Sequence, residues 1–202
     1  AYGDCHCRPD KKTAYTACEN ANNEILKEGS FGAGCGATVG KLYDMECCTK
    51  SGIASYSQTL ENGITVSALI AVNAFGDIIE NGKIIAGTTN KQKTAFIDTE
   101  KTMLEMAYPP AFHGQNTTIG IIATNAALTK SEAKKVAGMA HDGLARAIRP
   151  VHTQLDGDTL FCLSTGEISS SKPIVDLIGT LAARVTEQTV IRAVKKANHH
   201  SI

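Results

Sequence analysis

The residues around Thr117 place a hydroxyl side chain between two segments of opposite character. The stretch before it is polar and contains Pro109 and Pro110, whereas an apolar run begins at Ile119. If the Asn116-Thr117 peptide bond is broken, a hydroxyl and a free α-amine belong to one residue. Such an amine has a pKa of about 7.7–8.0, so near neutral pH it can accept the hydroxyl proton. The junction therefore makes Thr117 a candidate nucleophile that supplies its own general base.

The same three residues support two other interpretations. Asn116-Thr117-Thr118 also fits an N-glycosylation sequon, and threonine is common at the entrance of a strand. A sequon requires the secretory pathway, and the first residues contain no basic segment followed by an apolar one. Spacing alone leaves the catalytic and structural interpretations open.

The elements that would position this junction follow from periodicity and turn signals, which together predict one α+β domain over residues 1–202. A helix is expected over 10–28, strands over 53–60 and 64–73 with a turn at Asn62-Gly63, and a second hairpin at Asn81-Gly82. Further expected elements are a strand from Ile119, a helix from the Thr129–Glu132 capping box to about Ile148, a strand after Asp156-Gly157-Asp158, and a helix from Ser171 and Pro173 to about Lys196.

Burial predictions accompany two of these elements. The run over 64–73 is almost continuously apolar, which is typical of a strand covered on both faces. The last helix has a predicted buried stripe made of Ile174, Leu177, Ile178, Leu181, Val185, Val190, Ile191 and Val194.

Two irregular segments remain. The Gly-rich stretch from Phe31 to Lys41 departs from the spacing of a phosphate loop, and Leu42 stands where that motif has a hydroxyl residue, so nucleotide binding is rejected. Residues 87–116 form a long polar connection, predicted to be exposed and either functional or mobile.

Composition limits the kinds of partner that the protein is expected to bind. Twenty acidic and twenty basic side chains give zero formal net charge, and there is no tryptophan, which argues against nucleic acid and against a membrane surface. Seven cysteines are a poor disulfide framework, and a reduced cytoplasm fits them better. The cluster Cys5-His6-Cys7 does not match the usual spacing of zinc ligands, so we expect no metal site there.

Four blocks carry a family resemblance: GAGCGATVGK, TVSALIAVNAFGD, NTTIGIIATNAALTK, and MAHDGLARAIRPVHTQLDGDTLFCLSTG. In this order they resemble the DmpA-like peptidases, which include L-aminopeptidase/D-esterases, β-peptidyl aminopeptidases and nylon-oligomer endo-hydrolases. The resemblance implies an αββα sandwich of the N-terminal-nucleophile type. It also implies that a precursor cuts itself into an α piece, here 1–116, and a β piece, here 117–202. It further implies a homo-oligomer of such αβ units and no cofactor.

The resemblance assigns roles to particular residues. Thr117 matches the nucleophile and Asn116 the residue before the cut, while Asn73 matches an asparagine that helps to hold the oxyanion. Lys41 matches a lysine near the nucleophile in the nylon-hydrolase branch, where a cation would favour a neutral amine. Asp156 and Asp158 match positions that contact the amino end of the nucleophile, and they are both Asp in that branch.

Simpler structural roles are also open for these residues. Asn73 could cap a strand, Lys41 could be a solvated lysine, and two Asp residues around a glycine could form a plain turn. On the family interpretation no histidine is catalytic, and His141 is expected to be a structural or surface residue.

The expected function is hydrolysis of small peptides or peptide-like amides through an acyl-enzyme on Thr117. Family members usually carry about a hundred further residues before the point where this sequence begins, including part of the substrate pocket. Two alternatives therefore stand beside the hydrolase: an acyltransferase of the ornithine acetyltransferase type, and a shortened, catalytically inactive remnant.

Overall fold

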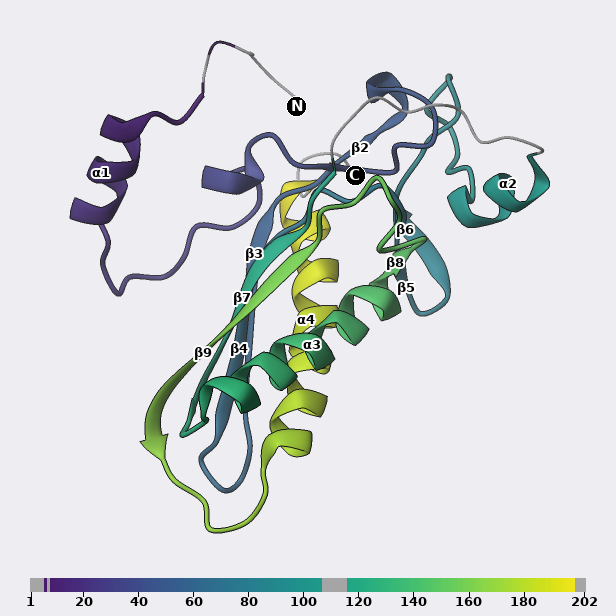
Figure 1. The fold of residues 1–202 in the computed structure, drawn as a ribbon. Coiled ribbons are helices and arrows are strands. Elements are labelled where there is room, and N and C mark those ends of the chain that lie inside the picture. Colours follow the sequence, from purple (N-terminus) through teal and green to yellow (C-terminus); the bar gives the residue numbers. More distant parts are fainter. Residues whose placement is uncertain (1–5, 7, 107–115, 199–202) are drawn as a thin grey trace.

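A four-stranded sheet forms the centre of the computed structural model, which describes residues 6, 8–106 and 116–198 (Figure 1). Its strand order is β3-β4-β7-β9. The strands are β3 (Ile53–Thr59), β4 (Thr65–Ala71), β7 (Ile119–Ala126) and β9 (Thr159–Ile168). The pairs β3/β4 and β4/β7 are antiparallel, whereas β7 and β9 run parallel. Strand β7 begins just after the predicted cleavage junction, so its pairing with β9 fixes the backbone that follows this junction.

Both predicted hairpins are present, because each has a turn residue that accepts a left-handed backbone. Gly63, between β3 and β4, has a φ of 81°. Asn81 and Gly82, with φ of 51° and 76°, join β5 (Asp77–Glu80) to β6 (Lys83–Ala86). Two consecutive residues with positive φ match the twist of a two-residue hairpin. A short strand β8 (Ile148–Arg149) pairs with β5 and completes a second sheet, β6-β5-β8.

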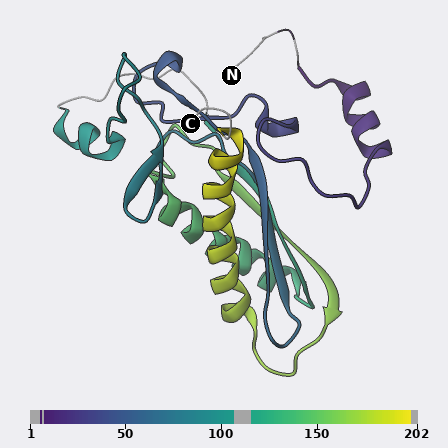
Figure 2. The same cartoon turned by 180° about the vertical axis from the view of Figure 1, so that it is seen from behind.

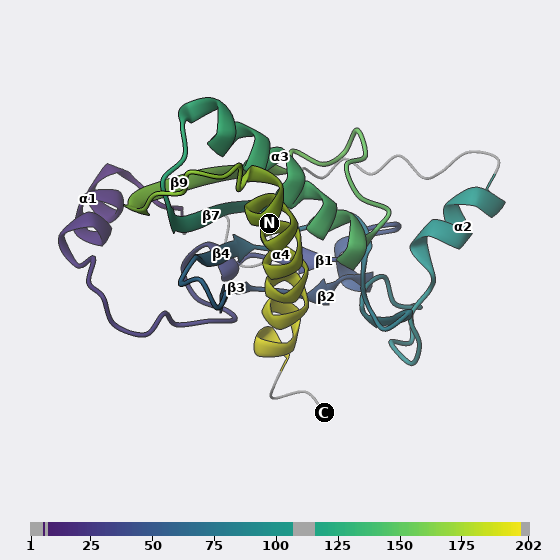
Figure 3. The same cartoon turned by 90° about the horizontal axis from the view of Figure 1, so that it is seen from below.

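Two long helices cover one face of the central sheet (Figures 2 and 3). Helix α3 (Lys130–Ala147) begins with the predicted capping box, in which the Thr129 hydroxyl and the Glu132 carboxylate each bond the other's backbone. Helix α4 (Val175–Ala197) packs on β3 and β4, and α3 packs on β9 and along α4. A Cβ at Gly143 would lie 2.2 Å from the Ala183 carbonyl oxygen, so glycine permits the close approach of the two helices.

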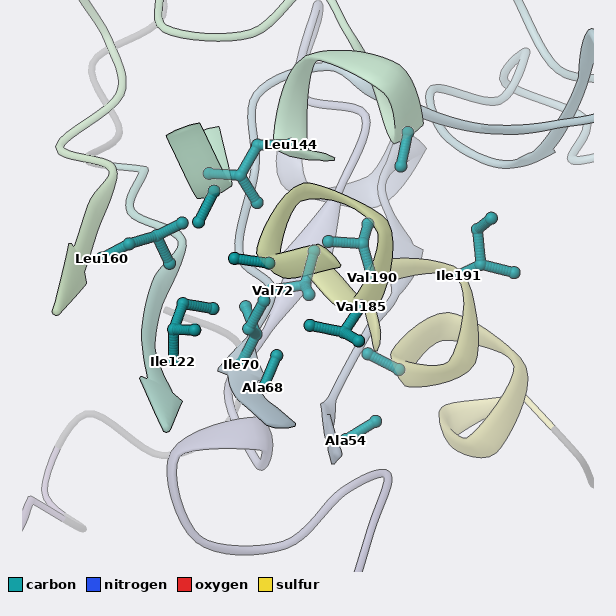
Figure 4. Close-up of a cluster of buried hydrophobic side chains, with 14 of the residues drawn as sticks. Ala54, Ala68, Ile70, Val72, Ile122, Leu144, Leu160, Val185, Val190 and Ile191 are labelled. Atoms are coloured by element: carbon teal, nitrogen blue, oxygen red, sulfur yellow. The ribbon is translucent and has the colours of Figure 1, made fainter. Parts of the chain in front are cut away.

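The core lies between the sheet and these helices (Figure 4). Ile70, Ile122, Leu144 and Val185 come from β4, β7, α3 and α4, and each is fully buried. Apolar burial at the interface of the two layers is the main force that holds the sheet against the helices. The α+β class is confirmed, and in the described residues the four-stranded sheet and the layer of helices α3 and α4 pack as two layers.

The remaining elements are short. They are α1 (Lys11–Glu19), the 3₁₀ turns Gly32–Gly34 and Met45–Cys47, β1 (Thr38–Val39) paired with β2 (Thr49–Lys50), and α2 (Thr99–Glu105). No helix within 8–106 and 116–198 is long and apolar enough to cross a membrane.

Three sequence-based predictions are wrong in detail. Helix α1 ends at Glu19 instead of residue 28, and none of its residues is buried, so tertiary packing does not extend it (Figure 1). Leu177 is 44% exposed, although the rest of the predicted α4 stripe lies on or beside the core. Strand β4 alternates between buried and half-buried residues, so the described structure covers one of its faces more than the other.

A buried carboxylate anchors the connection that follows β6. The Asp77 Oδ1 atom accepts hydrogen bonds from the Thr88 backbone N–H at 2.8 Å and the Thr99 hydroxyl at 2.7 Å, and Oδ2 accepts the Thr99 backbone N–H at 2.8 Å. All three residues are buried, although most of their neighbours over 89–106 are at least half-exposed. Residues 107–115 of the predicted connection lie outside the described residues.

Replacing Asp77 with asparagine should therefore destabilise the fold. The amide offers one acceptor oxygen where two backbone N–H groups now point at two oxygens, so one buried donor loses its partner at a cost of about 1–3 kcal/mol. Burial raises the pKa of Asp77 to about 6, so the group is mostly ionised at pH 8, where urea unfolding would show the loss. Asp98→Asn is the matched control, because Asp98 is a helix N-cap and asparagine caps equally well. An unchanged unfolding midpoint for Asp77→Asn would contradict this account.

Candidate active site

Backbone pairing holds the segment around Thr117 in place. The Asn116 N–H donates to the Leu155 carbonyl at 3.2 Å, the Gly157 N–H to the Asn116 carbonyl at 2.8 Å, and the Thr159 N–H to the Thr118 carbonyl at 2.9 Å. These bonds continue the parallel pairing of β7 and β9 backwards past the strand ends. Residue 117 is therefore fixed on both sides.

The Thr117 side chain lies against the bond that is predicted to break. Its Oγ1 donates to the Asn116 carbonyl oxygen at 2.6 Å, and its backbone N–H donates to the Asn73 carbonyl oxygen at 3.0 Å. Asn116 is 2% exposed, while Thr117 is half-buried. The hydroxyl is thus in contact with the carbonyl group that it would attack, and the future amine already has a hydrogen-bond partner.

Asn73 follows β4 and presents its side chain in a defined orientation. Its Oδ1 accepts from the Lys41 ammonium at 2.6 Å and from the Thr38 backbone N–H at 3.2 Å. Since both partners are donors, the oxygen faces them and the NH₂ group faces the other way. Within the described part of the chain Nδ2 has no hydrogen-bond acceptor. The amide nitrogen is therefore a free donor on a residue whose backbone carbonyl binds the Thr117 N–H.

Lys41 is a buried cation, at 3% exposure. Burial lowers its pKa to about 8, and the negative charge of Asp156 opposes this shift. Burial raises the pKa of the Cys48 thiol to about 11, so the neighbouring thiol is neutral near pH 7. Lys41 is thus mostly charged at neutral pH although it is buried, so it is not a solvated surface lysine.

The two aspartates hold the backbone of two different segments, one after Asn73 and one after Thr117. Asp156 accepts from the Phe75 N–H at 3.1 Å and, through its other oxygen, from the Thr153 hydroxyl at 2.7 Å. Asp158 accepts from the Thr118 N–H at 2.8 Å. Their hydrogen bonds are to residues near Asn73 and Thr117 rather than to Thr117 itself. A direct contact with the amine remains a prediction.

Sequence reasoning missed three contributors to this site. Thr38 orients Asn73 through its backbone N–H, and His152 contacts Asp158. Gly157 lies over the nucleophile, because a Cβ built on it would be 2.9 Å from Thr117 Oγ1. In the sequence, a glycine between two aspartates indicates only a turn, because Thr117, which Gly157 faces, lies forty residues earlier in the chain.

Gly157→Ala should consequently slow any reaction of the Thr117 hydroxyl. The added methyl group would push the hydroxyl away from its present position, and a small misplacement of a reacting atom can cost about 10²-fold in rate. Gly138→Ala is a suitable control, because a Cβ there meets no atom within 4 Å. Cleavage at 116-117, followed over time, is the measurement, and equal rates for the two variants would contradict the prediction.

Buried polar atoms without partners gather near the same place. Five such side-chain atoms occur among the described residues, and three of them belong to Thr38, Asn116 and Thr118. Groups of this kind are few in folded proteins, and each calls for an explanation such as a role in function. These three atoms lie in the segment of Thr38, which bonds Asn73, and in the segment on either side of Thr117. This supports the region around Asn73 and Thr117 as the candidate active site.

Metal chemistry has no candidate ligand set in the described ranges, where no group of three or more His, Cys, Asp or Glu residues could hold an ion. Cys5 and Cys7 of the Cys5-His6-Cys7 cluster lie outside the described residues.

The chain is similar to known proteins in both sequence and fold. The model of "Peptidase family S58" matches residues 4–201. An uncharacterized aminopeptidase of Mycobacterium leprae is 35% identical over 188 residues, which cover 84% of this chain and 48% of that protein. A 6-aminohexanoate-oligomer endohydrolase of a Kocuria species is 30% identical over 202 residues, which cover 93% of this chain and 56% of that protein. The chain thus spans about half the length of these relatives.

Among solved structures, the L-aminopeptidase D-Ala-esterase/amidase from Ochrobactrum anthropi is similar in fold. The TM-score is 0.66 at 20% sequence identity, and the alignment covers 92% of this chain and 49% of that one. That structure is described as a variant of the N-terminal-nucleophile hydrolase fold. At this identity the similarity shows the fold alone, and it confirms the predicted fold type.

Proposed function

Because the chain belongs to peptidase family S58, we propose that it hydrolyses amide bonds of small peptides or peptide-like amides with Thr117 as nucleophile. The observation that carries the proposal is the position of the Thr117 hydroxyl, 2.6 Å from the Asn116 carbonyl oxygen, in a residue whose backbone N–H binds the carbonyl oxygen of Asn73. The proposed nucleophile and the carbonyl that it would attack belong to adjacent residues, and Asn73, the proposed oxyanion donor, comes from a second segment whose backbone carbonyl accepts the Thr117 N–H.

The first reaction is self-cleavage. The Thr117 oxygen attacks the Asn116 carbonyl carbon, the C–N bond breaks, and the nitrogen that leaves becomes the α-amine of Thr117. The ester formed between the Asn116 acyl group and the hydroxyl is then hydrolysed by water. This releases a piece ending at Asn116 and one beginning at Thr117, whose amine and hydroxyl are now both free.

Substrate turnover repeats the chemistry with the released amine as base. The amine takes the hydroxyl proton, the oxygen attacks the substrate carbonyl, and the proton passes to the departing amine. The Nδ2 of Asn73 donates to the oxyanion, and Lys41 adds a positive charge that favours both the oxyanion and the neutral form of the amine. Water then attacks the acyl-enzyme and restores the hydroxyl.

A denaturing gel followed by N-terminal sequencing tests the proposal. Purified protein, incubated over time, should convert to two bands, one of which begins Thr-Thr-Ile-Gly. A single intact band after long incubation would instead favour an inactive remnant. An amine acceptor added to a working enzyme separates hydrolysis from acyl transfer, because only a transferase diverts most of the acyl group to that acceptor.

The names of the relatives indicate two substrate classes. One is called an aminopeptidase and another acts on 6-aminohexanoate oligomers, so α-peptides and ω-amides are the first substrates to compare. We also propose that the mature protein is a homo-oligomer of αβ units, which light scattering of the processed protein would measure directly.

A further inference from the structure

His152 makes a contact in the site that the proposed chemistry does not use. Its Nδ1 lies 2.9 Å from Asp158 Oδ2, and the Asp158 side chain is 2% exposed whereas that of His152 is 38% exposed. The other carboxylate oxygen of Asp158 accepts the Thr118 backbone N–H at 2.8 Å. One buried carboxylate therefore links an imidazole at the surface to the residue after the nucleophile.

The backbone at His152 adds an independent observation. Its φ is 56°, in the left-handed region that residues with a Cβ adopt at a cost in free energy. The imidazole also lies beside His141 of α3, with ring centroids 4.9 Å apart, so a helix supports it from a second side.

The link acts at the point that self-cleavage would weaken. Once the Asn116-Thr117 bond is broken, residue 117 is a chain end, and chain ends fray unless they are held. The hydrogen bonds of the Thr117 nitrogen to Asn73 and of the Thr118 nitrogen to Asp158 are then the nearest anchors. An Asp158 carboxylate fixed by His152 presents its second oxygen to Thr118 in one orientation.

We propose that His152 is a positioning residue for the nucleophile: it orients Asp158, which in turn fixes the Thr118 backbone and the hydroxyl of Thr117. The proposal rests on the proposed function of Thr117. It does not make His152 a proton donor or acceptor in the reaction, because its contact is with Asp158 and not with Thr117.

Two substitutions separate the side-chain contact from the backbone conformation. His152→Gly removes the imidazole and is at ease with positive φ, so the fold should be at least as stable. His152→Asn also tolerates positive φ, and its amide nitrogen can occupy the place of Nδ1 and donate to Asp158. We expect His152→Gly to process at 116-117 at least tenfold more slowly than the wild type, and His152→Asn to stay within about threefold of it.

The measurement is the first-order rate of chain scission after cell-free synthesis, with the thermal unfolding midpoint recorded for each variant. Gly138→Ala serves as control, since it lies on α3, the helix that carries His141, an added Cβ there meets no atom within 4 Å, and the rate should stay within about twofold. Equal rates for His152→Gly and wild type would overturn the positioning role, as would a His152→Asn variant as slow as the glycine variant. Scission that persists in Thr117→Ala, or is absent from the wild type, would instead overturn the proposed function itself.

Discussion

Thr117→Ala should leave the chain uncut and lower amide hydrolysis by at least about 10³-fold, since the reaction loses the atom that forms the acyl-enzyme. The fold should be retained, because Thr117 is only half-buried and its backbone bond to Asn73 remains. Thr117→Ser keeps a hydroxyl in the same position and should both cleave and turn over. Gel analysis and a rate measurement on the same preparations would provide the comparison.

Thr118→Val is the matched control for this pair. It removes a hydroxyl one residue further on while conserving shape, and the Thr118 hydroxyl is buried without a hydrogen-bond partner in the described structure. Scission and turnover should therefore persist. If Thr117→Ala still cut at 116-117, or if the two substitutions had equal effects, the nucleophile would have to be sought elsewhere.

Much of the fold could be predicted because its signals are local. Asn62-Gly63 and Asn81-Gly82 specify hairpin turns through their own backbone preferences, and the Thr129–Glu132 capping box places the start of α3 without reference to distant residues. The predicted end of α1 is wrong because local periodicity does not extend a helix that has no tertiary packing. Apolar residues recur there at helical spacing, but the helix buries none of them against the rest of the chain.

The candidate site could be predicted from the sequence only in part. The resemblance predicts the site residues Lys41, Asn73, Asp156 and Asp158. In the structure Lys41 bonds Asn73, Asp156 bonds Phe75 and Asp158 bonds Thr118. These three hydrogen bonds could not be predicted, because each joins segments at least thirty residues apart. Asp156 illustrates this: its carboxylate bonds Phe75 rather than the Thr117 amine, a choice that depends on how the end of β4 meets the start of β9.

A second large loss of activity is expected from substitution of Asn73, because the oxygen and the nitrogen of its side-chain amide have different roles. Its oxygen binds Lys41 and the Thr38 N–H, while its nitrogen is the free donor. Asn73→Asp keeps an acceptor for both partners, and Lys41 would pair with the new carboxylate, so the side chain should stay in place. Only the donor is lost, and its place is taken by an anionic oxygen that repels an oxyanion. Loss of one such donor costs about 10²–10³ in kcat.

Lys41→Met distinguishes this donor role from a loss of structure. Burial already lowers the pKa of Lys41 to about 8, which means that the charged form is destabilised where it lies. Removing the charge should therefore leave stability at pH 7 undiminished, although the free Asn73 oxygen then keeps only the Thr38 N–H. We expect a fall in kcat that is smaller than for Asn73→Asp, with both unfolding midpoints close to that of the wild type. If Asn73→Asp retained full turnover with an unchanged fold, the oxyanion would require another donor, and the Gly157 N–H, which now binds the Asn116 carbonyl, would be the next to examine.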